Sequence, residues 1–260
     1  MSAAPNHTSV LAASNLGFRY PGAAAPALEG ITLDLPAGVS VGLVGESGSG
    51  KSTIVNLLLG LQSPSSGSVT FRGAPLNLRD RQQMRQFRRT VQPVFQDPYS
   101  SLDPRLTIGR SVSEPLIALG LATDRQAIRS RVEELLLAVG LEPAMADRYP
   151  AAFSGGQRQR IAIARALAPE PQVILADEPV SALDVSVRMQ VIDLLRTLAE
   201  QRGLGLLLVS HDLTVIGALC QRLVVLANGR MVEQGETAEV LARPQHAYTR
   251  KLLTAVPRLP

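Results

Sequence analysis

The chain has 260 residues, of which 45% are hydrophobic, and its formal net charge is +4 at pH 7. It contains no apolar run of the ~18–20 residues that span a bilayer, and its start lacks the basic and apolar regions of a signal peptide. We therefore expect a cytosolic protein whose contact with a membrane, if any, depends on partners. The single cysteine, Cys220, excludes an internal disulfide or a cysteine-held cluster and is expected to be buried.

The first half of the chain begins with a strand that leads into a glycine-rich segment. Residues 39–44 (VSVGLV) predict a buried strand, followed directly by GESGSGKST at 45–53. Residues 52–62 (STIVNLLLGLQ) predict a helix that ends near Ser63 and Pro64. The arginine-rich run at 79–89 has no aromatic platform beside it, so a solvated helix face is favoured over a nucleic-acid site.

The middle of the chain, residues 97–165, shows helices and loops but no convincing strand. One amphipathic helix is predicted over 123–140, with a capping box formed by Thr123 and Gln126 and a stop at Gly140. This composition differs from that of the segments on either side. We therefore expect a helical subdomain inserted into a different core.

The second half returns to alternating strands and helices. Strands are predicted at 171–179 and 204–212, and a helix over 184–203 begins at its N-cap Asp184 and stops at Gly203. Residues 222–235 predict two strands with a turn at Asn228 and Gly229. Alternation of this kind predicts a parallel α/β sheet.

The glycine-rich segment matches the phosphate-binding pattern G-x-x-x-x-G-K-[ST] at Gly45, Gly50, Lys51 and Ser52. In such a loop backbone N–H groups surround the phosphates, the lysine reaches the β and γ groups, and the hydroxyl binds Mg²⁺. Lysine occurs only at positions 51 and 251, although the chain holds 26 basic residues. A compact ammonium fits between phosphate oxygens better than a guanidinium. The absence of an N-K-x-D motif favours adenine over guanine.

Four further residues complete a hydrolytic site. Asp177 and Glu178 end a buried strand, where Asp177 suits the Mg²⁺ shell and Glu178 can polarise an attacking water. His211 follows another strand, so it should emerge at the same sheet edge and contact the γ-phosphate. Gln96 lies where core and helical insert join, and it would bind Mg²⁺ or the water. Catalysis is thus assigned to Glu178, His211, Gln96 and Lys51.

These motifs, in this order, resemble the ATPase subunit of ATP-binding-cassette (ABC) transporters from about Leu11 to Gly235. The resemblance implies an α/β P-loop NTPase (RecA-like) core with an N-terminal antiparallel β region and an inserted α-helical subdomain. It implies an ATPase domain over residues 1–240, with its core at about 10–96 and 166–240 and the helical subdomain at about 97–165. Residues 241–260 would form a short C-terminal tail.

The resemblance also implies two sets of nucleotide contacts. Residues of this chain would hold ATP, with Tyr20 stacking on adenine and Ser52, Gln96 and Asp177 holding Mg²⁺; the set comprises Tyr20, Gly45, Glu46, Ser47, Gly48, Ser49, Gly50, Lys51, Ser52 and Thr53. FSGGQ (153–157) resembles the family's signature, so Ser154, Gly155, Gly156 and Gln157 would contact the ATP bound by a partner protomer. SALD (181–184) resembles the loop that links the two protomers.

FQDPYSSLDPR (95–105) and PQHAYTRKLLTAVP (244–257) resemble segments of the peptide/nickel importer branch. This implies ATP and Mg²⁺ as ligands and a position at the cytoplasmic face of the inner membrane. The implied partners are a second ATPase subunit, identical or homologous, two membrane permease subunits and an extracytoplasmic solute-binding protein; no nucleic acid is expected. The alternatives are a DNA-repair or chromosome ATPase and a transporter for another solute.

Overall fold

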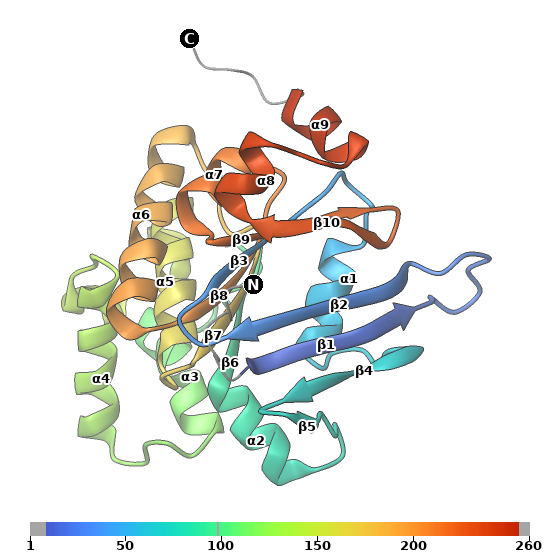
Figure 1. Ribbon diagram of the computed structural model, residues 1–260. Coiled ribbons are helices and arrows are strands. Elements are labelled where there is room, and N and C mark those ends of the chain that lie inside the picture. Colours follow the sequence, from blue (N-terminus) through green and yellow to red (C-terminus); the bar gives the residue numbers. More distant parts are fainter. Residues whose placement is uncertain (1–8, 98, 255–260) are drawn as a thin grey trace.

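The computed structural model describes residues 9–97 and 99–254, and these form two sheets with helices around them (Figure 1). The first sheet is antiparallel and has the strand order β2-β1-β4-β5. Its strands are β1 (Ser9–Phe18), β2 (Leu28–Pro36), β4 (Ser66–Phe71) and β5 (Ala74–Pro75). This sheet is the antiparallel β region expected near the N-terminus.

The second sheet has the order β10-β9-β3-β8-β7-β6. Five of these strands run parallel, while β10 pairs antiparallel with β9 across the turn at Asn228 and Gly229. Its strands are β3 (Ser40–Val44), β6 (Val91–Val94), β7 (Val173–Asp177), β8 (Gly205–Val209), β9 (Arg222–Ala227) and β10 (Arg230–Glu236). The predicted parallel α/β sheet and its terminal hairpin are thus confirmed.

The strands at the centre of the second sheet are buried on both faces, which explains their continuous apolar sequences. In β7, Val173 and Leu175 pack with the antiparallel sheet and α1 (Lys51–Leu58), whereas Ile174 and Ala176 face the opposite core. Figure 1 shows the helices of that opposite core on the side of the sheet away from β1 and β2. The sheet is therefore held rigid from both faces.

The remaining helices follow in chain order. They are α2 (Arg81–Thr90), α3 (Ile108–Ala118), α4 (Arg125–Ala138), α5 (Gly155–Leu167), α6 (Val185–Arg202), α7 (Leu213–Leu219), α8 (Thr237–Ala242) and α9 (Ala247–Thr254), with short 3₁₀ turns η1 (Pro143–Asp147) and η2 (Pro150–Ala152). In α2, Met84 and Phe87 are buried while the arginines are exposed. The lone Cys220 is buried, and burial raises the pKa of its thiol to about 12.

One predicted helix end is wrong by several residues, and one predicted N-cap is wrong by one residue. Helix α1 ends at Leu58 rather than near Ser63, because Gly60 takes a left-handed conformation (φ 67°) that stops the helix earlier. Helix α4 is capped by Asp124 instead of Thr123, and the Asp124 carboxylate accepts the Ala127 N–H at 2.7 Å. A carboxylate and a hydroxyl are both good N-caps, so adjacent candidates compete.

Candidate active site

The phosphate-binding loop follows β3 directly and ends where α1 begins. Gly50 is the N-cap of α1 and has φ 105°, a conformation that side chains rarely permit. At Gly45 a Cβ would collide with the Leu226 carbonyl, so the loop also requires glycine there. Among the described residues no side chain caps the first turn of α1. Its free N–H groups and the helix dipole therefore favour an anion.

Lys51 begins α1 and is only 7% exposed. Its Nζ donates to the carbonyl oxygens of Gly45, at 2.8 Å, and Glu46, at 3.0 Å. Burial lowers the pKa of Lys51, although the nearby Glu178 and Asp177 charges oppose this shift. Burial thus disfavours the charged ammonium, and an anionic ligand beside Lys51 would stabilise that charge.

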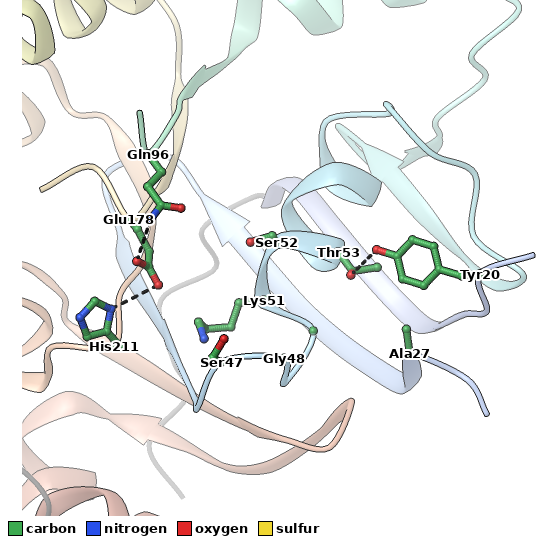
Figure 2. Close-up of a pocket in the computed structure, with 11 residues that line it drawn as sticks. Tyr20, Ala27, Ser47, Gly48, Lys51, Ser52, Thr53, Gln96, Glu178 and His211 are labelled. Carbon is green, nitrogen blue, oxygen red and sulfur yellow. Dashed lines mark hydrogen bonds and ion pairs between the residues drawn. The ribbon is translucent and has the colours of Figure 1, made fainter. Parts of the chain in front are cut away.

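A cavity of about 730 Å³ opens beside this loop, a size within the range of small-molecule sites. Its lining residues are Tyr20, Ala27, Ser47, Gly48, Gly50, Lys51, Ser52, Thr53, Gln96, Glu178 and His211. In Figure 2, Gln96, Glu178 and His211 lie on one side of Lys51, and Tyr20 and Thr53 lie on the other. The cavity therefore has a hydrolytic end and an aromatic end, with the phosphate loop between them.

At the aromatic end, Tyr20 follows β1 and keeps 42% of its surface exposed. Its ring meets the Phe18 ring edge to face, with centroids 4.9 Å apart, and its hydroxyl lies 2.9 Å from the Thr53 Oγ1. The hydroxyl bond links the tyrosine to α1. A ring held at two points and still exposed can stack on a planar base.

At the hydrolytic end, three strands deliver polar side chains to one edge of the sheet. Glu178 follows β7, His211 follows β8 and Gln96 follows β6. The Glu178 carboxylate lies 3.3 Å from His211 Nδ1 and 3.4 Å from Gln96 Nε2 (Figure 2). Glu178 has a left-handed backbone (φ 46°), a strained conformation for a residue other than glycine. Its amide bonds to the Val209 carbonyl, which fixes this turn.

Asp177 ends β7 just before Glu178 and is close to Ser52 and Lys51. Burial raises the pKa of Asp177, even though a hydrogen bond from the Ser52 side chain lowers it. Its Oδ1 atom is buried and has no hydrogen-bond partner among the described residues. A buried carboxylate oxygen without a partner beside a hydroxyl is a donor set that Mg²⁺ accepts.

The other predicted loop residues support the cavity without lining it. Ser49 is 5% exposed and packs beneath the loop against Gly45. The backbone N–H of Glu46 does not face the cavity, since it donates to the Tyr248 hydroxyl at 2.9 Å. Sequence reasoning missed this contact, as well as the place of Ala27 in the cavity wall, because no local pattern connects these residues to the loop.

The second glycine segment lies at the start of α5, and none of the described residues lining the cavity comes from 154–157. Ser154 is the N-cap and forms a capping box with Gln157. Gly156 is buried against Val187 of α6, where a Cβ would not fit. Ser154 remains accessible at the surface, Gly155 and Gln157 are half-buried, and Gly156 is covered by α6.

Tyr99, three residues after Gln96 in the sequence, lies beside this segment. The Arg158 guanidinium lies over the Tyr99 ring, 4.4 Å from its centroid, and the Tyr99 hydroxyl lies near Gly155. Pro98, within the predicted branch-specific segment, lies outside the described residues. Tyr99 therefore lies against the start of α5.

Within residues 9–97 and 99–254, no helix is both long and apolar enough to cross a bilayer. Residues 28–181 match the family model described as "ABC transporter", and residues 232–260 match "Oligopeptide/dipeptide transporter, C-terminal region". Residues 255–260 of the predicted tail segment lie outside the described residues.

Two curated relatives and a solved structure are similar to the chain. The oligopeptide transport ATP-binding protein OppD of Mycobacterium tuberculosis is 50% identical over 232 residues, which are 89% of this chain but only 38% of the relative. A putative peptide import ATP-binding protein of Brucella ovis is 48% identical over 230 residues, 88% of this chain and 72% of the relative. The chain thus spans about two fifths of the length of the first relative.

The structural comparison gives the same fold. A dimeric post-hydrolysis structure of the ATP-binding cassette MJ0796, bound to ADP and Pi, superposes with a TM-score of 0.78 at 33% identity. The superposition covers 87% of this chain and 98% of that one. The expected P-loop NTPase architecture is therefore confirmed.

Proposed function

Because the chain belongs to the ABC transporter family of ATP-binding proteins, we propose that it binds and hydrolyses ATP to power the import of peptides. The observation that carries this proposal is the cavity in which Lys51, Gln96, Glu178 and His211 meet beside a phosphate loop. The match of the tail to the oligopeptide/dipeptide transporter region supports peptides as the cargo. We also propose the division into a core, a helical subdomain over about 97–165 and a tail from 241.

The residues that line the cavity bind different parts of ATP. Tyr20 stacks on adenine, and the loop surrounds the phosphates with those of its backbone N–H groups that have no protein acceptor, which excludes the N–H of Glu46. Lys51 then exchanges its two carbonyl partners for oxygens of the β- and γ-phosphates. This exchange is favourable, since an ammonium bonds more strongly to an anionic oxygen than to a neutral carbonyl.

Hydrolysis takes place at the end of the cavity near Glu178. A water attacks the γ-phosphorus as the bond to the β–γ bridging oxygen breaks, yielding ADP and inorganic phosphate. The Glu178 carboxylate orients this water and accepts its proton. His211 contacts the γ-phosphate and, through Nδ1, keeps the carboxylate in place. Gln96 adds a neutral amide on the opposite side of the carboxylate.

Ser52, Asp177 and Gln96 are the residues that would hold Mg²⁺. The partnerless Asp177 oxygen supports this assignment, because a buried carboxylate is stable only with a compensating charge or donor. The ion would neutralise phosphate charge when bound. The protein's own contribution is to keep Ser52 and Asp177 together at the start of α1 and the end of β7.

The exposed start of α5 completes the site of a second protomer. Ser154, Gly155, Gly156 and Gln157 would meet the partner's γ-phosphate, where the N-terminal dipole of α5 favours negative charge. ATP would hold two protomers together, and loss of the γ-phosphate would release them. The dimeric state of the similar cassette supports the pairing of two protomers, and since it holds ADP and Pi, release would follow departure of the cleaved phosphate. Residues 181–184 would lie at the same interface.

We propose the remaining partners by analogy with the family. They comprise a second ATPase subunit, identical or homologous, two membrane permease subunits and an extracytoplasmic solute-binding protein. The chain would act as a peripheral subunit on the cytoplasmic face of the membrane, since none of its described helices can cross a bilayer. No nucleic acid takes part in this scheme.

The test is reconstitution of the chain in vesicles with its permease subunits, the second ATPase subunit and the solute-binding protein. We expect Mg²⁺-dependent release of phosphate from ATP that depends on the permeases and is accompanied by peptide uptake. Uptake of nickel chelates without peptides would change the cargo and leave the ATPase assignment intact. Stimulation of ATPase activity by nucleic acid, with no response to permeases, would contradict the transport proposal.

A further inference from the structure

Glu46, in the phosphate-binding loop, is held at three points. Its N–H donates to the Tyr248 hydroxyl at 2.9 Å, and its carbonyl accepts from Lys51 Nζ at 3.0 Å. Its carboxylate lies 3.1 Å from Lys251 Nζ. The only two lysines in the chain thus contact the same residue, one from inside the loop and one from the tail helix α9.

Helix α9 is attached to the body of the protein independently of Glu46. The Glu233 carboxylate of β10 accepts the N–H groups of Gln245, at 2.7 Å, and His246, at 3.0 Å, just before the helix. Leu252 and Leu253 pack against the core that contains Ile174 and Ala176, and Thr249 is 2% exposed. Figure 1 shows α9 beyond β10 at the C-terminal end of the chain. The helix therefore offers the loop a fixed support.

The contacts of Tyr248 and Lys251 with Glu46 have different effects. The Tyr248 hydroxyl bonds to a backbone amide, so it directly limits how far the Glu46 peptide can turn. The Lys251–Glu46 pair is exposed, with 71% and 54% of the side-chain surfaces accessible, and contributes little to stability. Its effect is electrostatic. Lys251 offsets the Glu46 charge, which would otherwise repel phosphates bound beside it.

We propose that Tyr248 and Lys251 are positioning residues for nucleotide binding, acting through Glu46 on Lys51. This inference rests on the proposed ATPase function. When phosphates draw Lys51 away, the Glu46 carbonyl loses its donor, and the tail contacts keep the peptide from following. Tyr248 preorganises the loop, and Lys251 holds the Glu46 charge outward. Reciprocally, bound nucleotide stabilises α9 on the loop.

The experiment measures the Kd of the full chain for ATP by titration calorimetry, together with thermal unfolding. We expect Tyr248→Phe to raise Kd by about threefold to tenfold, the range for loss of one hydrogen bond, with little change in melting temperature. Lys251→Gln should raise Kd by about twofold at low salt and less at high salt. The exposed Tyr149→Phe and Arg243→Gln serve as matched controls and should leave Kd unchanged.

Two further readouts separate positioning from general support. Lys251→Gln should have no effect in a Glu46→Gln background, since the charge that it controls is then gone. Addition of ATP should slow hydrogen exchange of α9 amides in the parent chain, and less so in Tyr248→Phe. If the parent binds ATP and neither Tyr248→Phe nor Lys251→Gln changes Kd, the inference is wrong. A parent chain that does not bind ATP would overturn the proposed function and this inference with it.

Discussion

His211 Nδ1 lies 3.3 Å from the Glu178 carboxylate, although the two residues follow different strands of the parallel sheet. The strands β7 and β8 are hydrogen-bonded neighbours in register, so the residues that follow them emerge side by side. Gln96 approaches the same carboxylate from the end of β6, at 3.4 Å. The carboxylate therefore has a defined orientation toward the cavity before any ligand is bound.

Replacement of this carboxylate tests its role as the proton acceptor. Glu178→Gln should lower the hydrolysis rate by about 10²–10⁴-fold, because an amide cannot accept the proton of the attacking water. ATP binding should persist, and the variant should accumulate as an ATP-bound dimer, detectable by light scattering. The exposed Glu142→Gln should behave like the parent chain. Normal phosphate release by Glu178→Gln would remove this residue from the mechanism.

The ionised Asp177 side chain should lower the free energy of unfolding of the chain when no ligand is bound. Burial raises its pKa above the ordinary value of 3.8, so the folded chain binds this proton more tightly than the unfolded chain. The contribution of Asp177 to the free energy of unfolding is therefore highest below pH 3.8 and falls as the pH rises through the raised pKa. Asp177→Asn should therefore raise the melting temperature of the nucleotide-free chain at pH 7, and the gain should shrink toward low pH.

The same variant should lose the stabilisation that ATP and Mg²⁺ give to the parent, because one oxygen of the proposed metal shell becomes an amide. Thermal unfolding with and without ligand measures both effects. The exposed Asp147→Asn controls for the change in net charge. A melting temperature at pH 7 equal to or below that of the parent would show that the buried charge is compensated in another way.

Two substitutions at Ser154 separate helix capping from contact with a partner's nucleotide. Ser154→Ala removes the cap of α5 and should cost about 1 kcal/mol of stability. Ser154→Asp keeps a capping oxygen and should retain the melting temperature, yet its charge would face the partner's phosphates. We expect both variants to lose ATP-driven dimerisation, measured by light scattering. Undiminished pairing and turnover in Ser154→Asp would contradict the assignment of α5 to a shared site.

We expect Tyr20, at the aromatic end of the cavity, to bind ATP through its ring. Tyr20→Phe loses only the hydroxyl contact with Thr53, so its ATP affinity should stay near that of the parent. Tyr20→Ala should weaken ATP binding by about tenfold, because stacking on one base contributes ~1–3 kcal/mol. Inorganic tripolyphosphate has no base, and its binding should be equal in all three chains. Equal losses for both ligands would indicate a distorted phosphate loop instead.

Local patterns in the sequence were sufficient for the phosphate loop, the parallel strands and the hairpin at Asn228 and Gly229. Each of these depends on residues close together in the chain: glycines with positive φ, continuous apolar runs and a turn pair. The ends of the helices were predicted less well. Thr123 and Asp124 are both good N-cap residues, so the local sequence does not decide which of them caps α4.

The sequence by itself determined which chemical groups the protein carries and on which strands and helices they lie. It also predicted that the polar residues after the parallel strands meet at one edge of the sheet. Only the tertiary structure decided the strand order that sets their distances and the contacts of the tail helix. The order of the strands brings Gln96, Glu178 and His211 together, and the docking of α9 places Tyr248 and Lys251 on Glu46. Such contacts join residues far apart in the chain, and their geometry depends on how whole elements pack, which no local pattern encodes.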